Sequence, residues 1–332
     1  MRILVTGGCG FIGSNFIRHI LSRYPDYTIV NLDALTYAGN TENLRDIQDD
    51  IRYTFVKGRI EDATLVSRLM ERVDCVVHFA AESHVDRSIV DAQPFLMTNV
   101  IGTYTMLDAA RKASVRRFVH ISTDEVYGAL GDTGRFDEET PLRPNSPYAA
   151  SKASGDLLVR SFHETFGFPA VIVRPSNNYG PYQYPEKLIP LMITNLFEGK
   201  RVPVYGEGKN VRDWLFVEDN CRAIDLILHN GRTGETYNVG GDCERRNIEI
   251  VREVLKMMEK DEASITFVKD RPGHDFRYAL DNSKIERELG WRPLVDGEKG
   301  LEKTIGWYRN NEWWWRPLKE RLDSESKGFW TA

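Results

Sequence analysis

The sequence feature that most constrains the fold is a glycine-rich turn close to the amino terminus. A short apolar run at residues 3–5 leads into Gly7, Gly10 and Gly13, and a helical pattern follows at residues 13–24. At the start of a helix, free backbone N–H groups and the helix dipole attract the negative charge of a pyrophosphate. A strand, a glycine turn and a helix in this order predict a dinucleotide-binding βαβ unit.

Asp33 indicates which dinucleotide the chain prefers. It closes the second apolar run, 20 residues after Gly13. A carboxylate at this place accepts both hydroxyl groups of the adenosine ribose and repels a 2′-phosphate. Residues 34–37 contain no Arg or Lys that would bind such a phosphate. We therefore expect the cofactor to be NAD and not NADP.

Short β-branched runs alternate with longer amphipathic stretches through the first half of the chain. The runs predict strands at residues 3–5, 28–32, 53–56, 75–79, 118–121 and 170–173. The stretches between them predict helices at residues 13–24, 63–72, 94–113 and 148–166. Strands that alternate with helices of this length indicate an α/β fold with a doubly wound, Rossmann-type parallel sheet.

After about residue 179, glycine and proline pairs interrupt shorter elements. This change predicts an NAD-binding domain over residues 1–179 and a smaller C-terminal lobe, residues 180–332, that mainly binds substrate. Residues 235–241 (ETYNVGG) have the pattern of a strand, which we expect to complete the main sheet. A chain of 332 residues is long enough for two domains.

Composition excludes several classes of protein. Hydrophobic residues make up 41% of the chain and charged residues 28%, as in globular proteins. The formal net charge of -5 leaves no basic field for a nucleic-acid backbone. The 4 cysteines lie far apart and no histidine pair has ligand spacing, so we expect no metal site and a reducing, cytoplasmic location. No apolar run is long enough to span a membrane, and we expect no membrane partner.

A candidate catalytic pair lies at the start of the helix predicted over residues 148–166. Tyr148 and Lys152 are four positions apart, so their side chains lie on one helix face. The ammonium favours the ionised phenol, which would let Tyr148 accept a proton. Thr123 follows the strand predicted at residues 118–121, at a sheet edge where ligands bind in open α/β folds.

Thr123, Tyr148 and Lys152 in this order, after the glycine turn, resemble the extended short-chain dehydrogenase/reductase family over nearly the whole chain. Within it, further motifs are similar to those of the dTDP-glucose 4,6-dehydratases. The motifs are residues 78–86 (HFAAESHVD), 122–128 (STDEVYG), 177–182 (NNYGPY), 185–190 (PEKLIP), 211–214 (VRDW), 237–241 (YNVGG), 271–275 (RPGHD) and 311–318 (NEWWWRPL).

The resemblance implies an NAD-dependent hydro-lyase that converts dTDP-glucose to dTDP-4-keto-6-deoxyglucose and water. NAD would take a hydride from C4 of the sugar and return it to C6. Tyr148, aided by Lys152 and Thr123, would take the proton of the 4-hydroxyl group. Glu125 would then remove the C5 proton, and Asp124 would protonate the departing 6-hydroxyl group. Two neighbouring carboxyl groups would thus need opposite protonation states.

The resemblance also implies two sets of binding residues. The cofactor set is Gly7, Gly10, Phe11, Ile12, Gly13, Asp33, Thr36, Arg59, Ile60, Ala80, Ala81, Ser83, Thr98, Tyr148, Lys152 and Asn178. The substrate set is Ser83, Thr123, Asn177, Lys187, Leu188, Pro203, Tyr205, Arg212, Asn247, Arg271, His274 and Tyr278. Arginine suits a diphosphate because its planar guanidinium matches the oxygens in a bidentate way.

Arg59 departs from the family pattern, in which an acidic residue precedes Ile60 and contacts the adenine amino group. Two arrangements are open. Arg59 either stacks on the adenine, or it points to solvent while Glu61 or Asp62 takes the place of the acidic residue.

The resemblance further implies a homodimer, formed by a four-helix bundle of the helices over residues 94–113 and 148–166. We expect Val100, Leu107, Leu157, Leu158 and Phe162 to form the apolar faces that pair.

Three other functions remain open at this point. One is a sugar-nucleotide 4-epimerase or decarboxylase, against which Asp124 and Glu125 argue. Another is a 4,6-dehydratase for a different nucleotide sugar. The third is a dinucleotide-binding regulator without catalytic activity, against which the intact catalytic residues argue.

Overall fold

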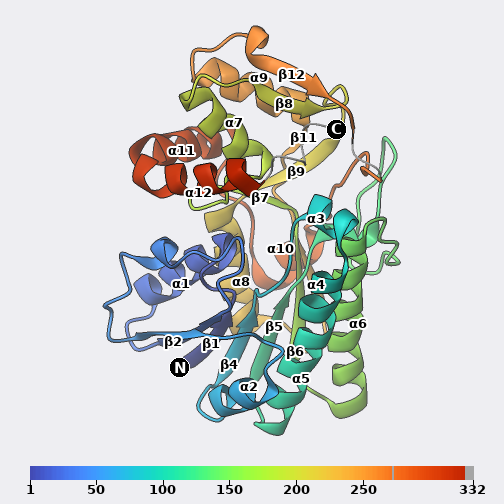
Figure 1. Ribbon diagram of the computed structural model, residues 1–332. Helices are drawn as coiled ribbons and strands as arrows, with labels where there is room; N and C mark the ends of the chain where they lie inside the picture. Colours follow the sequence, from blue (N-terminus) through green and yellow to red (C-terminus); the bar gives the residue numbers. More distant parts are fainter. Residues whose placement is uncertain (271–272, 326–332) are drawn as a thin grey trace.

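Seven parallel strands form the central sheet (Figure 1). The structure is a computed structural model and describes residues 1–270 and 273–325. The strand order across the sheet is β10-β6-β5-β4-β1-β2-β3. These strands are β1 (Arg2–Thr6), β2 (Thr28–Asp33), β3 (Tyr53–Lys57), β4 (Cys75–His78), β5 (Arg117–Ile121), β6 (Ala170–Pro175) and β10 (Thr236–Val239). The doubly wound parallel sheet expected from the sequence is confirmed.

The strands are apolar on both faces because helices cover both. In β1, Ile3 and Val5 belong to one core and Leu4 to the other, as period-two alternation requires. The helices α1 (Phe11–Arg23) and α8 (Val217–Asn230) pack on the first core. The helices α2 (Ala63–Met70), α5 (Thr103–Lys112) and α6 (Pro147–Phe166) pack on the second.

The single helix expected over residues 94–113 is wrong in detail. The chain forms α4 (Gln93–Phe95), then the π-helical segment η2 (Leu96–Gly102), and only then α5. A π-helical segment turns side chains to directions that a continuous α-helix does not give them. Within it, Thr98 faces the pocket described below, and Asn99 is buried against Ser151 of α6. Before this region lies α3 (Val85–Val90), and two 3-10 turns are η1 (Thr41–Leu44) and η3 (Asp124–Tyr127).

A second group of elements surrounds a third apolar core beyond the carboxyl ends of the sheet strands (Figure 1). Its strands are β7 (Asn177–Tyr179), β9 (Val211–Phe216) and β11 (Glu244–Arg246) in one sheet, and β8 (Val202–Tyr205) with β12 (Ile265–Val268) in another. Its helices are α7 (Leu188–Phe197), α9 (Asn247–Met257), α11 (Gly297–Asn310) and α12 (Glu312–Glu325), with the 3-10 turn η4 (Glu262–Ser264). We call this group the upper lobe. The chain enters the upper lobe after β6 and returns to the main sheet with α8 and β10. It then enters the upper lobe again with β11, and α10 (Ser283–Leu289) brings it back to β10 of the main sheet.

The apolar residues that face outward on η2, α5 and α6 differ from those that we expected. Leu107 and Phe162 are buried in the core against the sheet, so they cannot pair with another subunit. Leu157 is exposed as expected, and Val100 and Leu158 are half-buried. The exposed apolar side chains in this region also include Ile89, Val90, Leu96, Met97, Ile101, Tyr104 and Phe166.

Candidate active site

A pocket lies between the main sheet and the upper lobe. It is at the carboxyl ends of the neighbouring strands β1 and β4, which are followed by helices on opposite faces of the sheet. Open α/β sheets bind ligands at this kind of switch point. Every residue of the expected cofactor set, from Gly7 to Asn178, lines the pocket. The five expected catalytic residues line it as well. Of the expected substrate set, Ser83, Thr123, Asn177 and Lys187 line it.

The glycine turn is shaped for close approach of backbone to a ligand. Gly7 has a φ of 70°, which disfavours any residue with a side chain. A Cβ atom on Gly7 would lie 2.7 Å from the nitrogen of Ala80, and one on Gly13 would lie 2.4 Å from the Gly7 oxygen. Gly10 is the N-cap of α1, so the first-turn N–H groups have no partner within the helix. This cradle fits the pyrophosphate of a dinucleotide.

Asp33 links the glycine turn to the end of β2. Its carboxylate accepts hydrogen bonds from the backbone nitrogens of Cys9, at 2.9 Å, and Leu35, at 2.8 Å. Burial raises the pKa of Asp33, and these two backbone donors oppose that effect. Asp33 lines the pocket next to the glycine turn, where its carboxylate can accept hydrogen bonds from the hydroxyl groups of a ribose.

We expected either Glu61 or Asp62 to replace the acidic residue that the family has before Ile60, and the two carboxylates have different surroundings in the structure. The Asp62 side chain caps α2 by accepting hydrogen bonds from the nitrogens of Thr64 and Leu65. Glu61 lines the pocket and accepts a hydrogen bond from Thr98 Oγ1 at 3.0 Å. The Arg59 guanidinium, 57% exposed, lies 3.4 Å from the Glu61 carboxylate. Glu61 is therefore the carboxylate available to a ligand at this end of the pocket.

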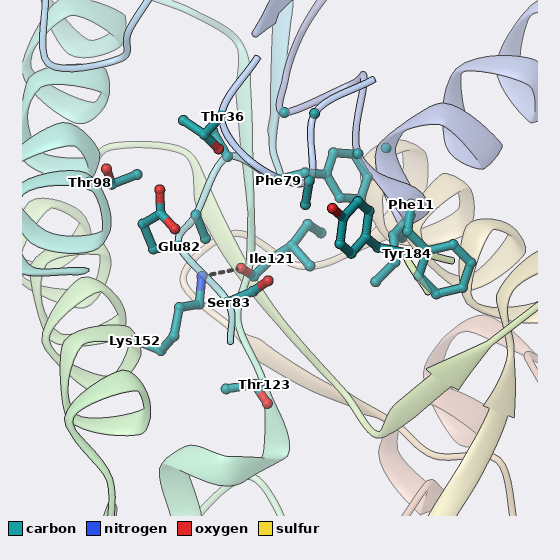
Figure 2. Close-up of a pocket in the computed structure, with 18 of the residues that line it drawn as sticks. Phe11, Thr36, Phe79, Glu82, Ser83, Thr98, Ile121, Thr123, Lys152 and Tyr184 are labelled. Atoms are coloured by element: carbon teal, nitrogen blue, oxygen red, sulfur yellow. Dashed lines mark hydrogen bonds between the residues drawn. The ribbon is translucent and has the colours of Figure 1, made fainter. Parts of the chain in front are cut away.

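Tyr148 and Lys152 lie at the start of α6, which begins after the Ser146 cap and Pro147. Lys152 is buried, and its Nζ donates a hydrogen bond to the carbonyl oxygen of Ile121 at 2.7 Å (Figure 2). Burial lowers the pKa of Lys152 to about 8, and Asp156 opposes that shift. Lys152 therefore carries its positive charge at neutral pH.

The ionisation of Tyr148 differs from our expectation. We expected the Lys152 ammonium to favour the phenolate. Instead, burial raises the pKa of Tyr148, and the neighbouring Glu125 raises it further, whereas the Thr123 hydroxyl lowers it. Burial of Tyr148 therefore opposes the ionised form, which we expected Lys152 to favour.

Asp124 and Glu125 begin the 3-10 turn η3, which Thr123 caps two residues after the end of β5. Thr123 Oγ1 accepts a hydrogen bond from the Glu125 nitrogen at 3.3 Å and donates one to Asp124 Oδ1 at 3.2 Å. Asp124 is 2% exposed, and its Oδ2 has no hydrogen-bond partner among the described residues. Burial, and then the charge of Glu125, raise the pKa of Asp124 well above its usual range. Asp124 is thus a buried carboxyl group whose surroundings favour the protonated form, next to the more exposed Glu125.

The other expected substrate residues lie in the upper lobe or beside it. The Arg212 guanidinium stacks 4.4 Å above the Tyr278 ring and donates a hydrogen bond to the Asp275 carbonyl at 3.0 Å. The buried Oδ1 of Asn247 has no hydrogen-bond partner among the described residues. Tyr205 packs its ring edge-on against His274. Leu188 begins α7 and Pro203 lies on β8. Lys187, already named in the pocket wall, donates from its Nζ to the Ser83 carbonyl at 3.3 Å. Arg271 lies outside the described residues.

The sequence argument missed several residues of the pocket wall. Tyr37, Glu82, Gln183, Tyr184 and Glu186 line it without having been assigned a role. Figure 2 shows Tyr184 beside Phe11, across the pocket from Thr98 and Glu82. Glu82 and Glu186 stand inside motifs that we noted, so their position was a usable signal. Tyr37 and Tyr184 lie in segments without a regular pattern, and only the fold brings them together.

Two negative findings concern the described residues alone. Within residues 1–270 and 273–325, no group of three or more His, Cys, Asp or Glu side chains is arranged to hold a metal ion. No helix in the same part of the chain combines the length and apolar character needed to cross a membrane.

Comparisons with known proteins agree with this site. The sequence pattern of the GDP-mannose 4,6 dehydratase family matches residues 4–304. The dTDP-glucose 4,6-dehydratase of Streptomyces niveus is 53% identical over 323 residues, covering 96% of each chain. The dTDP-glucose 4,6-dehydratase of Streptomyces venezuelae, solved with NAD bound, has a TM-score of 0.94 and 54% identity, covering 96% of this chain and 100% of its own.

An epimerase is also similar, at a greater distance. The UDP-glucuronic acid 4-epimerase of Bacillus cereus, solved with NAD, has a TM-score of 0.88 and 31% identity, covering 93% of this chain and 99% of its own. The fold is therefore shared between the two activities, while the identity is much higher to the dehydratases. This chain belongs to the dTDP-glucose 4,6-dehydratases, a family of extended short-chain dehydrogenase/reductases.

Proposed function

We propose that this protein is an NAD-dependent hydro-lyase that converts dTDP-glucose to dTDP-4-keto-6-deoxyglucose and water. The observation that carries the proposal is the pair Asp124 and Glu125, which opens into the pocket beside Thr123, Tyr148 and Lys152. The last three suffice to oxidise an alcohol. The carboxyl pair adds the acid and the base that removal of water requires.

Each residue has one task in the proposed cycle. Tyr148 accepts the proton of the 4-hydroxyl group as the C4 hydride leaves, and Thr123 hydrogen-bonds the oxygen that becomes the ketone. Glu125 removes the C5 proton, which the ketone has made acidic, and gives a proton back to C5 when the hydride reaches C6. Asp124 gives its proton to the 6-hydroxyl group, which departs as water. NAD, when bound, accepts the C4 hydride, returns it to C6, and contributes a positive charge that favours the ionised form of Tyr148.

The environment of each group supports its task. Burial beside Glu125 raises the pKa of Asp124 and so favours the protonated form that an acid needs. Glu125 is only half-buried, so its carboxyl group stays accessible to a substrate in the pocket. Lys152 is charged below about pH 8, and its charge adds to the factors that stabilise the Tyr148 phenolate.

The residues around the pocket divide between cofactor and substrate in our proposal. The main-sheet part, residues 1–179 with the strand near 235–241, holds NAD through the glycine turn and Asp33. The later part, residues 180–332, mainly holds the nucleotide diphosphate. The Arg212 guanidinium, already stacked on Tyr278, supplies a rigid cation for the phosphates.

The deciding experiment is an incubation of the purified protein with dTDP-glucose in deuterium oxide. A dehydratase gives a 4-keto-6-deoxy product that absorbs after alkali treatment and carries solvent deuterium at C5. The Tyr148→Phe variant is the control, because it removes the proposed base and leaves the fold intact. A product epimerised at C4, without a ketone, would show that the reaction is an epimerisation. Parallel incubations with UDP-glucose and GDP-mannose test the choice of nucleotide.

We also propose a homodimer in the cytoplasm. Exposed Leu96, Met97, Ile101 and Tyr104 on η2 and α5 lie next to α6, where Leu157 is 57% exposed. Two copies of this face would bury these side chains as a four-helix bundle. The cysteines are all unpaired, as in a reducing compartment. Sedimentation of the wild type and of a Leu157→Arg variant tests the interface: we expect a dimer and a monomer, respectively.

A further inference from the structure

We propose that the C-terminal helix α12 is a latch that holds the cofactor in its pocket during turnover. It does so through hydrogen bonds from Trp314 and Arg321 to the segment over residues 34–44, which we call the cover segment. The proposal rests on the proposed function, because a hydride that leaves C4 and returns to C6 requires that the cofactor stays bound between the two steps.

The cover segment forms one wall of the pocket. Its residues Ala34, Thr36, Tyr37, Ala38 and Gly39 all line the pocket. The segment follows β2 and has no strand of its own, so it depends on contacts with other elements to keep its place. The cover segment makes hydrogen bonds with the glycine turn and with α12.

Asn43 makes the first link. It is 1% exposed, and its Nδ2 donates a hydrogen bond to the Cys9 carbonyl in the glycine turn at 2.8 Å. The same carbonyl accepts a hydrogen bond from the Asn40 nitrogen at 3.0 Å. The Asn43 Oδ1 accepts a hydrogen bond from the Trp314 indole N–H of α12 at 2.7 Å. A continuous chain of hydrogen bonds therefore runs from α12 to the phosphate cradle.

Arg321 makes the second link, two turns further along α12. Its guanidinium donates hydrogen bonds to the Tyr37 carbonyl and, at 3.3 Å, to the Tyr184 hydroxyl. Tyr37 and Tyr184 both line the pocket, and their rings contact edge to face at 5.9 Å. Arg321 thus joins the cover segment to the pocket wall that the upper lobe supplies.

These links oppose release of the cofactor. A bound dinucleotide leaves only if the cover segment moves away from the glycine turn. That movement separates Asn43 from Trp314 and leaves buried donors and acceptors without partners, which is costly. Figure 1 shows α12 on the side of the upper lobe that faces the amino-terminal part of the chain, as a latch on this segment requires.

The chain offers a matched pair of variants. Trp314 and Trp315 are adjacent and buried, and each indole donates one hydrogen bond. The Trp315 bond goes to the Tyr308 carbonyl inside the upper lobe, so it does not reach the cover segment. The variants W314F and W315F therefore both remove an indole N–H from the same core, and only W314F cuts the link to Asn43.

The test measures exchange of protein-bound NAD with labelled NAD in solution. We expect exchange from W314F to be about tenfold faster than from the wild type, which corresponds to ~1.4 kcal/mol. We expect W315F to stay within about twofold of the wild type, and W314F to release reduced cofactor during turnover. Equal exchange rates for W314F and W315F would overturn the latch.

A second pair covers the case in which a tryptophan variant does not fold. R321Q removes the link to Tyr37, whereas R316Q removes an ion pair with Glu312 within α12. Faster NAD exchange from R321Q alone supports the latch, and equal exchange from both contradicts it. A wild-type protein that binds no NAD would instead refute the proposed function.

Discussion

Replacing Asp124 by Asn tests the division of labour between the two carboxyl groups. The side chain is 2% exposed, and burial and the charge of Glu125 raise its pKa, which favours the protonated form. Asn is also neutral and nearly the same size, and its Oδ1 still accepts the hydrogen bond from Thr123. The substitution therefore removes a transferable proton without unpairing a buried charge. We expect the free energy of unfolding to change by less than about 1 kcal/mol.

The catalytic effect should be much larger than the structural one. Loss of a positioned general acid typically slows a step by about 10²- to 10⁴-fold, or ~3 to 5 kcal/mol in the barrier. That penalty applies when the leaving group is the poor 6-hydroxyl group. A dTDP-glucose analogue with fluoride at C6 needs little proton assistance, so the variant should turn it over at a rate much closer to that of the wild type.

The assay compares product formation from both substrates by the wild type and Asp124→Asn. Asp132→Asn is the control, because Asp132 is an exposed carboxylate a few residues further on. Thermal melting of all three proteins checks the fold. If Asp124→Asn slows both substrates equally, Asp124 does not protonate the leaving group, and our reasoning about its burial fails.

Other substitutions test the remaining groups. Tyr148→Phe should slow C4 oxidation by more than about tenfold, with neither reduced cofactor nor product seen in a rapid-quench assay; a smaller loss would exclude Tyr148 as the main base. Asp33→Asn should narrow the preference for NAD over NADP in binding titrations, because it removes the charge that repels a 2′-phosphate; an unchanged ratio would contradict that role. His229→Gln should lower the melting temperature more at pH 5.5 than at pH 9. The hydrogen bond that the His229 ring donates to the Asp225 carboxylate raises the pKa of His229. The stabilisation by the charged ring, about 1 kcal/mol at a helix C-terminus, is therefore complete below the unfolded-state pKa and is lost as the pH rises through the folded-state pKa. A difference that does not depend on pH would refute this.

The sequence predicted the features that depend on local pattern. The glycine turn follows β1, Asp33 ends β2, and Asp124 lies shortly after β5; parallel strands bring their carboxyl ends to one edge of the sheet. For this reason the expected cofactor and catalytic residues line one pocket. The doubly wound parallel sheet was predicted from the alternation of strand and helix, whereas the order of its strands was not.

Features that depend on packing between distant segments were not predictable in this way. The burial of Leu107 and Phe162 depends on which faces of α5 and α6 pack against the sheet, and the apolar pattern of each helix alone does not decide this. The pKa of Tyr148 is set by burial, which no spacing reveals. The contact between Asn43 and Trp314 joins residues 271 positions apart, and no periodic pattern connects them.

The shared fold of dehydratases and epimerases shows where the choice of reaction is made. In our proposal, Thr123, Tyr148 and Lys152 create a ketone at C4, and this first step does not commit the sugar to either outcome. Commitment requires that the C5 proton is removed before the hydride returns to C4. Under the proposed roles, Glu125 can do this only while ionised, and Asp124 can release water only while protonated. The structure buries Asp124, which favours its protonated form, and leaves Glu125 half-buried. We propose that this difference in burial between two adjacent residues directs the ketone toward elimination.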